Sequence, residues 1–249
     1  MKASAIEFRL RMPINAVIIV LGFWAPWIDA WSIGNRIPLL EWLALEISRT
    51  GLFRFTVATP VVILAAALIA GVAAVLRVWG TAYLGSFTVH SLGMKAEGVV
   101  AEGPYRFVRN PLYLGLWAMT AALAFLMPRT GALVTMTLLT VFLLRLIMAE
   151  EGYLSAQLGE PYRAYLQSVP RLVPRLRSSI AHGGSKPDWM RGFLTELLSI
   201  GVFVTLAFLS WSYDNRLMGQ AILISFGVSL IVRALLPNSS REPHGVTNA

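Results

Sequence analysis

The 249-residue sequence contains no cysteine and only three histidines. The absence of cysteine excludes disulfides, thiolate nucleophiles and zinc or iron–sulfur sites with cysteine ligands, and it leaves the redox compartment undetermined. The histidines, His90, His182 and His244, lie far apart in the sequence. This spacing does not match a histidine-rich metal site, so we expect no bound metal.

Charge is also scarce. Charged residues make up 14% of the chain and hydrophobic residues 56%, whereas soluble domains carry about 25% charged residues. So few charges cannot cover a water-facing surface of this size, which indicates a membrane protein. The net charge is +8. In a membrane protein this excess favours contact with anionic lipid headgroups and a cytoplasmic location of the basic loops, rather than nucleic-acid binding.

Six apolar runs are candidate membrane spans, because crossing the hydrocarbon core takes about 20 mainly apolar residues. The sequence therefore predicts an all-α fold, a polytopic transmembrane helical bundle of about six spans. A further stretch, residues 37–55, is expected to lie at the outer interface as an amphipathic segment. The six predicted spans are residues 13–33, 57–79, 112–127, 131–148, 192–211 and 217–236.

The basic residues predict the orientation. With the N-terminus inside, sixteen of the 21 lysines and arginines fall in inner segments or at inner helix ends, and five fall outside. This positive-inside bias, with an even number of spans, predicts a multi-pass membrane protein with both termini in the cytoplasm. We divide the chain into residues 1–79, an N-terminal pair of helices, 80–178, a cofactor-binding core, and 187–249, a C-terminal two-helix membrane unit.

Two inner segments, residues 80–111 and 149–191, concentrate the polar residues. Only residues 128–130 separate the third apolar run from the fourth, which predicts a tight helical hairpin at 112–148. Since the two helices are similar in length, Asn110 and Glu150 are expected at the same membrane face.

The first inner segment has glycines at 98 and 103 and prolines at 104 and 111, which permit turns and end local structure. Pro111 suits the first turn of the third helix, whose free N–H groups favour an anionic ligand. Taken alone, its tyrosines and arginines are typical of headgroup anchors in an interfacial loop.

In the second segment only one of the adjacent acids Glu150 and Glu151 can point inward, because neighbours lie about 100° apart around a helix. That acid needs a partner, either Arg109, a hydroxyl or a bound ligand.

The run Glu102-Gly-Pro-Tyr-Arg-Phe-Val-Arg-Asn-Pro-Leu-Tyr-Leu-Gly115 resembles the signature of the isoprenylcysteine carboxyl methyltransferase and phospholipid methyltransferase family. The preceding run Arg77–Gly85 and a set of later residues also resemble this family. The resemblance covers residues 66–175. Two linked motifs in the right order around a hairpin make it specific. The later residues are Glu150-Glu151, Leu158-Gly-Glu-Pro-Tyr162, Tyr165, Val169-Pro-Arg171 and Pro174-Arg175.

This resemblance implies a membrane methyltransferase that uses S-adenosyl-L-methionine at the cytoplasmic face and takes a lipophilic or prenylated substrate from the bilayer. It also implies the binding residues, and we expect Arg109 and Glu150 to take part in catalysis. The implied cofactor-binding positions are His90, Glu97, Gly98, Val99, Val100, Tyr105, Asn110, Pro111, Leu112, Tyr113 and Glu150.

Two positions depart from the family pattern. Asn110 replaces a commoner histidine and cannot titrate, so it can position a ligand but cannot shuttle a proton. A substrate-contacting arginine of the prenylcysteine enzymes falls on Leu146, and Arg145 would face about 100° away. This departure weakens the case for a prenylcysteine carboxylate as the substrate.

The cofactor already activates the methyl group, so the protein is expected to supply binding, alignment and exclusion of water. No dedicated base is evident, which favours an acceptor that is already nucleophilic or easily deprotonated. Two rival functions stay open. A sterol-type reductase would need cations around the phosphates of NADPH, where this chain has Glu150 and Glu151. A non-catalytic membrane scaffold would bind no cofactor.

Overall fold

The regular structure of this protein is helical. The computed structural model describes residues 2–24, 37–84, 99–178, 180–181, 183–212 and 214–235, and within them no strand forms beyond an isolated bridge between Pro38 and Pro128. The α-helices are α1 Ala5–Arg9, α2 Arg11–Phe23, α4 Leu39–Arg49, α5 Phe55–Leu84, α7 Pro111–Ala124, α8 Arg129–Leu158, α9 Glu160–Ser168, α10 Trp189–Thr195, α11 Leu197–Val204 and α12 Asn215–Leu235. Short helical turns are η1 Gly103–Arg106, the π-helical η2 Thr205–Leu209 and η3 Ser210–Ser212.

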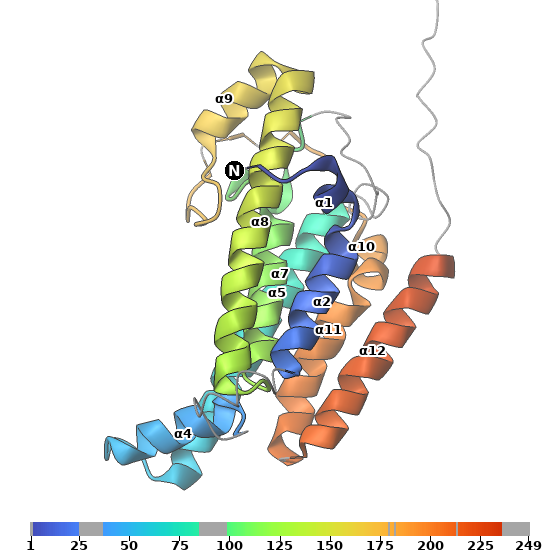
Figure 1. Ribbon diagram of the computed structural model, residues 1–249. Coiled ribbons are helices and arrows are strands. Elements are labelled where there is room, and N and C mark those ends of the chain that lie inside the picture. Colours follow the sequence, from blue (N-terminus) through green and yellow to red (C-terminus); the bar gives the residue numbers. More distant parts are fainter. Residues whose placement is uncertain are drawn as a thin grey trace, which may run out of the picture.

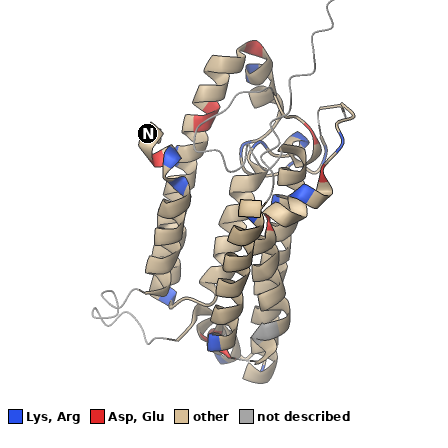
Figure 2. Ribbon diagram, turned by 90° about the vertical axis from the view of Figure 1, so that its right-hand side faces the viewer, with Lys and Arg blue, Asp and Glu red and all other residues tan. Residues whose placement is uncertain are grey.

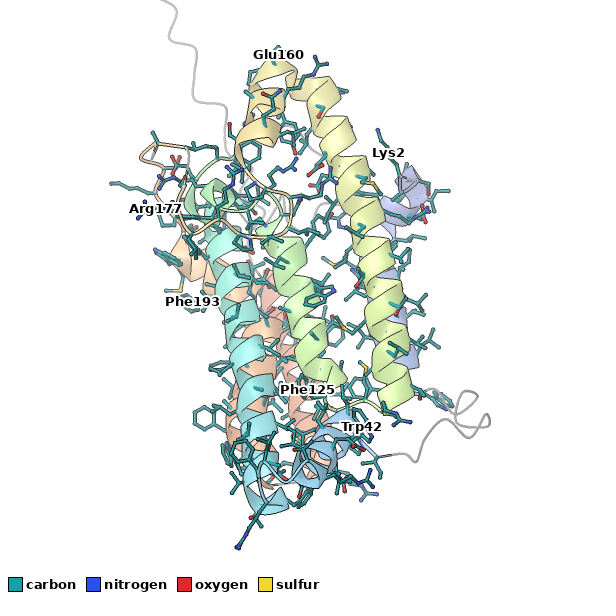
Figure 3. All side chains as sticks on the ribbon, turned by 90° about the vertical axis from the view of Figure 1, so that its left-hand side faces the viewer. Lys2, Trp42, Phe125, Glu160, Arg177 and Phe193 are labelled. Carbon is teal, nitrogen blue, oxygen red and sulfur yellow. The ribbon has the colours of Figure 1, made fainter. Side chains whose placement is uncertain are left out.

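The long helices run side by side as one bundle, with α4 at one end and α9 at the other (Figure 1). The N-terminus and the last described turn of α12 both lie at the α9 end of the bundle (Figure 1). Figure 3 shows Lys2, Glu160 and Arg177 at this same end, and Trp42 and Phe125 at the opposite one. We call these the α9 end and the α4 end.

The prediction of six spans is not confirmed. Among the described helices, α5, α8 and α12 are long and apolar enough to cross a membrane, and the α10–α11 pair makes a fourth only if its 67° bend is counted within one span. The described helix α2 has 13 residues and α7 has 14, or about 20 Å each, against a hydrocarbon core of about 30 Å. Residues 25–33 of the predicted first span lie outside the described residues.

The tight hairpin is confirmed. Helix α7 ends at Ala124, the turn of residues 125–127 is closed by short-range backbone hydrogen bonds, and Pro128 precedes α8. Proline suits this place because helix starts need no N–H donor there. Helix α8 continues to Leu158, ten residues beyond the apolar run, until Gly159 turns the chain with a φ of +62°. The amphipathic segment expected at 37–55 forms α4, whose start is tied to the hairpin turn by a hydrogen bond from Leu39 N–H to the Met127 carbonyl (2.8 Å).

Small residues set how closely the central helices approach. Ala66, Ala70 and Ala73 on α5 are 0–1% exposed, and Ala122 on α7 is fully buried. Interfaces between membrane helices favour such residues because the backbones can then pack closely. The opposite face of α5 presents large apolar side chains, among them Leu64 and Leu68, as expected of a surface that contacts lipid tails.

Charged residues lie mainly toward the two ends of the bundle and are sparse along its middle (Figure 2). This distribution agrees with burial of the middle in hydrocarbon, because a charge at the centre of a bilayer costs several kcal/mol. Together with the apolar spans, it supports an integral membrane protein. The α9 end carries the residues of both sequence motifs.

Candidate functional site

The described residues before α7, from 99 onward, contain the first motif as a compact loop. Gly103 has a φ of +55°, and a Cβ at this position would overlap the ring of Tyr83 at the end of α5. Only glycine meets both conditions without strain. The turn buries Pro104 and Tyr105 against α5, so the sequence Gly-Pro-Tyr is explained by local backbone geometry and packing.

The second motif fastens onto this loop. The Tyr165 hydroxyl of α9 donates to the Tyr105 carbonyl (2.8 Å), and Arg109 N–H donates to the Pro170 carbonyl (2.9 Å). Tyr165 also packs with Tyr162, their ring centroids 5.8 Å apart, and Val99 lies against this pair. Burial raises the pKa of the Tyr162 and Tyr165 hydroxyls well above the usual value, so both stay protonated donors at neutral pH. Two segments some sixty residues apart thus form one unit.

Glu150 faces α7 from α8. Its carboxylate accepts a hydrogen bond from the Tyr113 hydroxyl (2.9 Å). This contact confirms that the hairpin brings the two polar segments to the same end. A hydrogen bond at this distance between two side chains with little exposure limits the rotation of both. Glu150 and Tyr113 therefore fix each other's orientation.

Glu151 faces the loop and the segment after α9. Its oxygens lie 3.2 Å from Arg109 Nη1 and 2.7 Å from Arg171 Nη2, and the side-chain amide of Asn110 donates to it over 3.4 Å. The expectation that only one acid finds an inward partner is wrong. The loop wraps around the end of α8, so two neighbouring faces of that helix meet protein. Arg109 pairs with Glu151, the second acid.

Two buried polar atoms in this region have no hydrogen-bond partner among the described residues: the Tyr105 hydroxyl and Arg109 Nε. Tyr105 is 7% exposed, and its hydroxyl lies 3.6 Å from where a Cβ of Gly80 would be. Burial, and then the nearby charge of Glu150, raises the pKa of Tyr105 well above its usual value, so the hydroxyl stays a proton donor. Buried polar groups are usually hydrogen-bonded, so these two donors are suited to contact a ligand.

Of the other predicted binding residues, four are described by the structure and three are not. Pro111 is buried at the start of α7, and Leu112 beside it packs on Gly80 of α5. Val99 and Val100 are half-buried in the loop before η1. The remaining predicted positions, His90, Glu97 and Gly98, lie outside the described residues.

The side chain of Asn110 does not cap α7, because its amide is turned toward Glu151 and the Arg171 carbonyl (3.2 Å). The first-turn N–H groups of α7 are therefore not satisfied by their own N-cap side chain, and they suit an anionic acceptor.

Sequence reasoning missed several charged contacts. It left Glu151 and Arg171 without an assigned pairing, and it did not identify Glu196, which is fully buried against Arg77. It also gave no role to Arg11, which is buried on the Phe8 ring, 4.3 Å from its centroid. The position of Glu196 inside an apolar run was the one sequence feature that could have indicated a buried acid. Among the described residues, no group of three or more His, Asp or Glu side chains is arranged to hold a metal ion.

Comparison with known families gives one match. Residues 53–160 match the family model described as phospholipid methyltransferase. Over this segment the chain is similar to the phospholipid methyltransferase family. The match confirms the resemblance inferred from the motifs and indicates methyltransferase activity. Tyr105, Asn110, Tyr113 and Glu150 lie inside the segment matched to the phospholipid methyltransferase family, whereas Arg171 and Glu196 follow it. No curated protein and no solved structure matched the chain significantly.

Proposed function

We propose that the protein transfers a methyl group from S-adenosyl-L-methionine to a lipophilic acceptor, at the α9 end of the bundle. The proposal is supported by the match to the phospholipid methyltransferase family over residues 53–160. The observation that carries it is the convergence of Tyr105, Tyr113 and Glu150 on one region, with the buried Tyr105 hydroxyl lacking a partner among the described residues.

The donor groups present fit such a cofactor. A carboxylate at Glu150 suits an amino group or ribose hydroxyls, and the Arg109 Nε donor suits a carboxylate. The Tyr105 hydroxyl adds a neutral donor. When bound, S-adenosyl-L-methionine supplies a methyl group that its sulfonium has already activated.

The chain's own residues then bind and orient the cofactor and the acceptor, and they exclude water from the site. Tyr113 holds Glu150 in one orientation, so that carboxylate is preorganised. The pair Glu151 and Arg171 closes the loop over the end of α8. The ring faces of Tyr105 and Tyr113 can stabilise a positive charge by about 0.5–2 kcal/mol.

The acceptor we propose carries a nucleophilic atom that needs no strong base. Tyr113 already engages Glu150, and two arginines engage Glu151, so neither acid is a dedicated proton acceptor. Leu146 is fully buried among apolar neighbours that include Phe8 and Leu143. Position 146 itself therefore supplies no cation for a prenylcysteine carboxylate, which favours a different lipid acceptor.

We also propose that the chain crosses the membrane six times, with the α9 end in the cytoplasm. The helical runs alternate in direction, and the N-terminus and the end of α12 lie together at the α9 end (Figure 1). The short helices α2 and α7 would then cross together with adjoining residues or in a locally thinned bilayer.

The test is calorimetric binding of S-adenosyl-L-methionine to the full chain in detergent. We expect Glu150→Ala to weaken binding by about 10- to 100-fold, because a hydrogen bond to a charged group contributes about 1.5–3 kcal/mol. Tyr105→Ala should weaken it as well. Glu160→Ala is the matched control, since that side chain is 81% exposed on α9.

Equal affinity in Glu150→Ala, Tyr105→Ala and the wild type, with all three folded, would reject the site. Thermal shift by NADPH but not by S-adenosyl-L-methionine would favour a reductase. A scaffold would show neither shift and no incorporation of labelled methyl into extracted lipids.

A further inference from the structure

A buried ion pair joins the C-terminal helices to α5. Arg77 near the end of α5 donates from Nε and Nη2 to the two carboxylate oxygens of Glu196, over 2.6 and 3.0 Å. Glu196 is the residue between α10 and α11, where the helix direction changes by 67°, and it is fully buried. Charges buried in a membrane bundle are costly and are retained only where they have partners.

Neutral groups complete the environment of this carboxylate. The Thr81 hydroxyl donates to Oε1 (2.9 Å) and the Ser199 hydroxyl to Oε2 (3.3 Å). Each oxygen of Glu196 therefore has one charged and one neutral donor. With both oxygens engaged in this way, the carboxylate and the guanidinium can adopt only one mutual orientation.

The same guanidinium also reaches α7. Arg77 Nη1 donates to the Leu112 carbonyl (3.3 Å), in the first turn of that helix. One turn later, a Cβ on Gly115 would overlap Arg77 Cγ, so α7 passes directly over the arginine side chain. Arg77 thus contacts the turn that carries Asn110 and Tyr113, the latter bonded to Glu150.

The backbone next to Glu196 is held by further hydrogen bonds to α12 and α5. Arg233 of α12 donates from Nε and Nη2 to the Thr195 carbonyl, over 3.1 and 2.9 Å. Asp188 N–H before α10 donates to the Ala82 carbonyl at the end of α5 (2.9 Å). The break between α10 and α11 is therefore held from both sides, next to the acid.

We infer that Glu196 is a positioning residue for methyl transfer, which acts through Arg77 to hold the first turn of α7 in its cofactor-binding geometry. This inference rests on the proposed function. It gives the C-terminal helices, which lie outside the segment matched to the phospholipid methyltransferase family, a role at the site. Without Glu196, Arg77 would lose its fixed orientation and Tyr113 its alignment with Glu150.

The test compares two arginine-to-lysine variants of the full chain in detergent, measuring S-adenosyl-L-methionine affinity and melting temperature. Arg77→Lys keeps the charge opposite Glu196, but a single ammonium cannot reproduce the planar contacts to Glu196 and Leu112 together. We expect its dissociation constant to rise about tenfold. Arg145→Lys is the matched control: its guanidinium pairs with Glu7 of α1 (2.8 Å), outside the Glu196–Arg77 linkage, and its dissociation constant should stay within twofold of the wild type.

Glu196→Gln should also raise the dissociation constant. If a charge variant fails to fold, Thr81→Val removes a neutral donor from Glu196 while keeping both charges, and a smaller rise is expected. Lower melting temperatures with unchanged affinity in every folded Arg77, Glu196 and Thr81 variant would overturn the inference and leave the pair a structural contact. A wild-type protein that binds no S-adenosyl-L-methionine would instead reject the proposed function.

Discussion

At the scale of single residues, Glu150 and Glu151 are adjacent in sequence but have different surroundings. Glu151 is 6% exposed and paired with Arg109 and Arg171, whereas Glu150 has a neutral partner, the Tyr113 hydroxyl. A paired acid between two cations is suited to stabilising the fold. An acid held by a hydroxyl has no ion-pair partner to lose when a ligand binds it. The two neighbours are therefore expected to respond differently to the same substitution.

Glu151→Gln should lower the free energy of unfolding by about 3 kcal/mol, because it leaves Arg109 without a counter-charge in a buried position. The value lies at the lower end of the range for buried pairs because the Arg171 side chain is 45% exposed. Glu150→Gln keeps an acceptor for Tyr113 and should change stability by less than about 1 kcal/mol. Denaturant titration of both variants checks this, and equal losses would contradict the assigned roles.

At the scale of elements, α2 and α8 approach each other through small residues. A Cβ on Gly131 would overlap the carbonyl oxygen of Gly22, and a Cβ on Gly22 would overlap the Thr135 side chain. Backbone atoms cannot move aside as flexible side chains can. The contact explains how the N-terminal helix, which lies outside the matched segment 53–160, packs against the core.

Gly131→Ala should destabilise the protein by about 1–3 kcal/mol, as overpacking does in tight interfaces. Gly219 on α12 supplies the control, because a Cβ there meets nothing within 4 Å. Gly219→Ala should be neutral or slightly stabilising, since alanine favours helix over glycine by about 1 kcal/mol. The melting temperatures of the two variants are the measurement. A similar effect at both positions would show that the α2–α8 contact is not tight.

At the scale of the whole molecule, the α4 end and the α9 end are expected on opposite sides of the membrane. The chain has no cysteine, so a single introduced cysteine reports its own position. Glu160→Cys and Arg49→Cys suit this purpose because their side chains are 81% and 72% exposed. Each substitution removes one partner of a solvent-exposed ion pair, and such pairs contribute little to stability.

In sealed vesicles of known orientation, a membrane-impermeant maleimide should label one of these cysteines from each side. Glu160→Cys is expected to react from the cytoplasmic side and Arg49→Cys from the other. Labelling of both from the same side would contradict the proposed topology. An unsubstituted chain, which lacks thiols, gives the background.

Much of the fold follows from local patterns. The apolar runs around residues 57–79 and 131–148 predict long helices, and Pro128 with its neighbours predicts the hairpin turn, because run length and turn residues act over short stretches of chain. The shared end of Asn110 and Glu150 then follows from helix lengths alone. The run at 192–211 is different: its composition suggests one continuous span, but the helix breaks at Glu196, where the carboxylate meets Arg77.

The sequence by itself therefore determined the membrane character, the helical runs, the hairpin and the family resemblance of residues 53–160. Only the tertiary structure decided which partner each buried charge has: Arg109 with Glu151, Tyr113 with Glu150, and Arg77 with Glu196. The physical reason is that a helix's apolar content is a property of its own residues. The partner of a buried charge depends on the rotation and depth of two helices distant in sequence, which the packing of all their neighbours sets together.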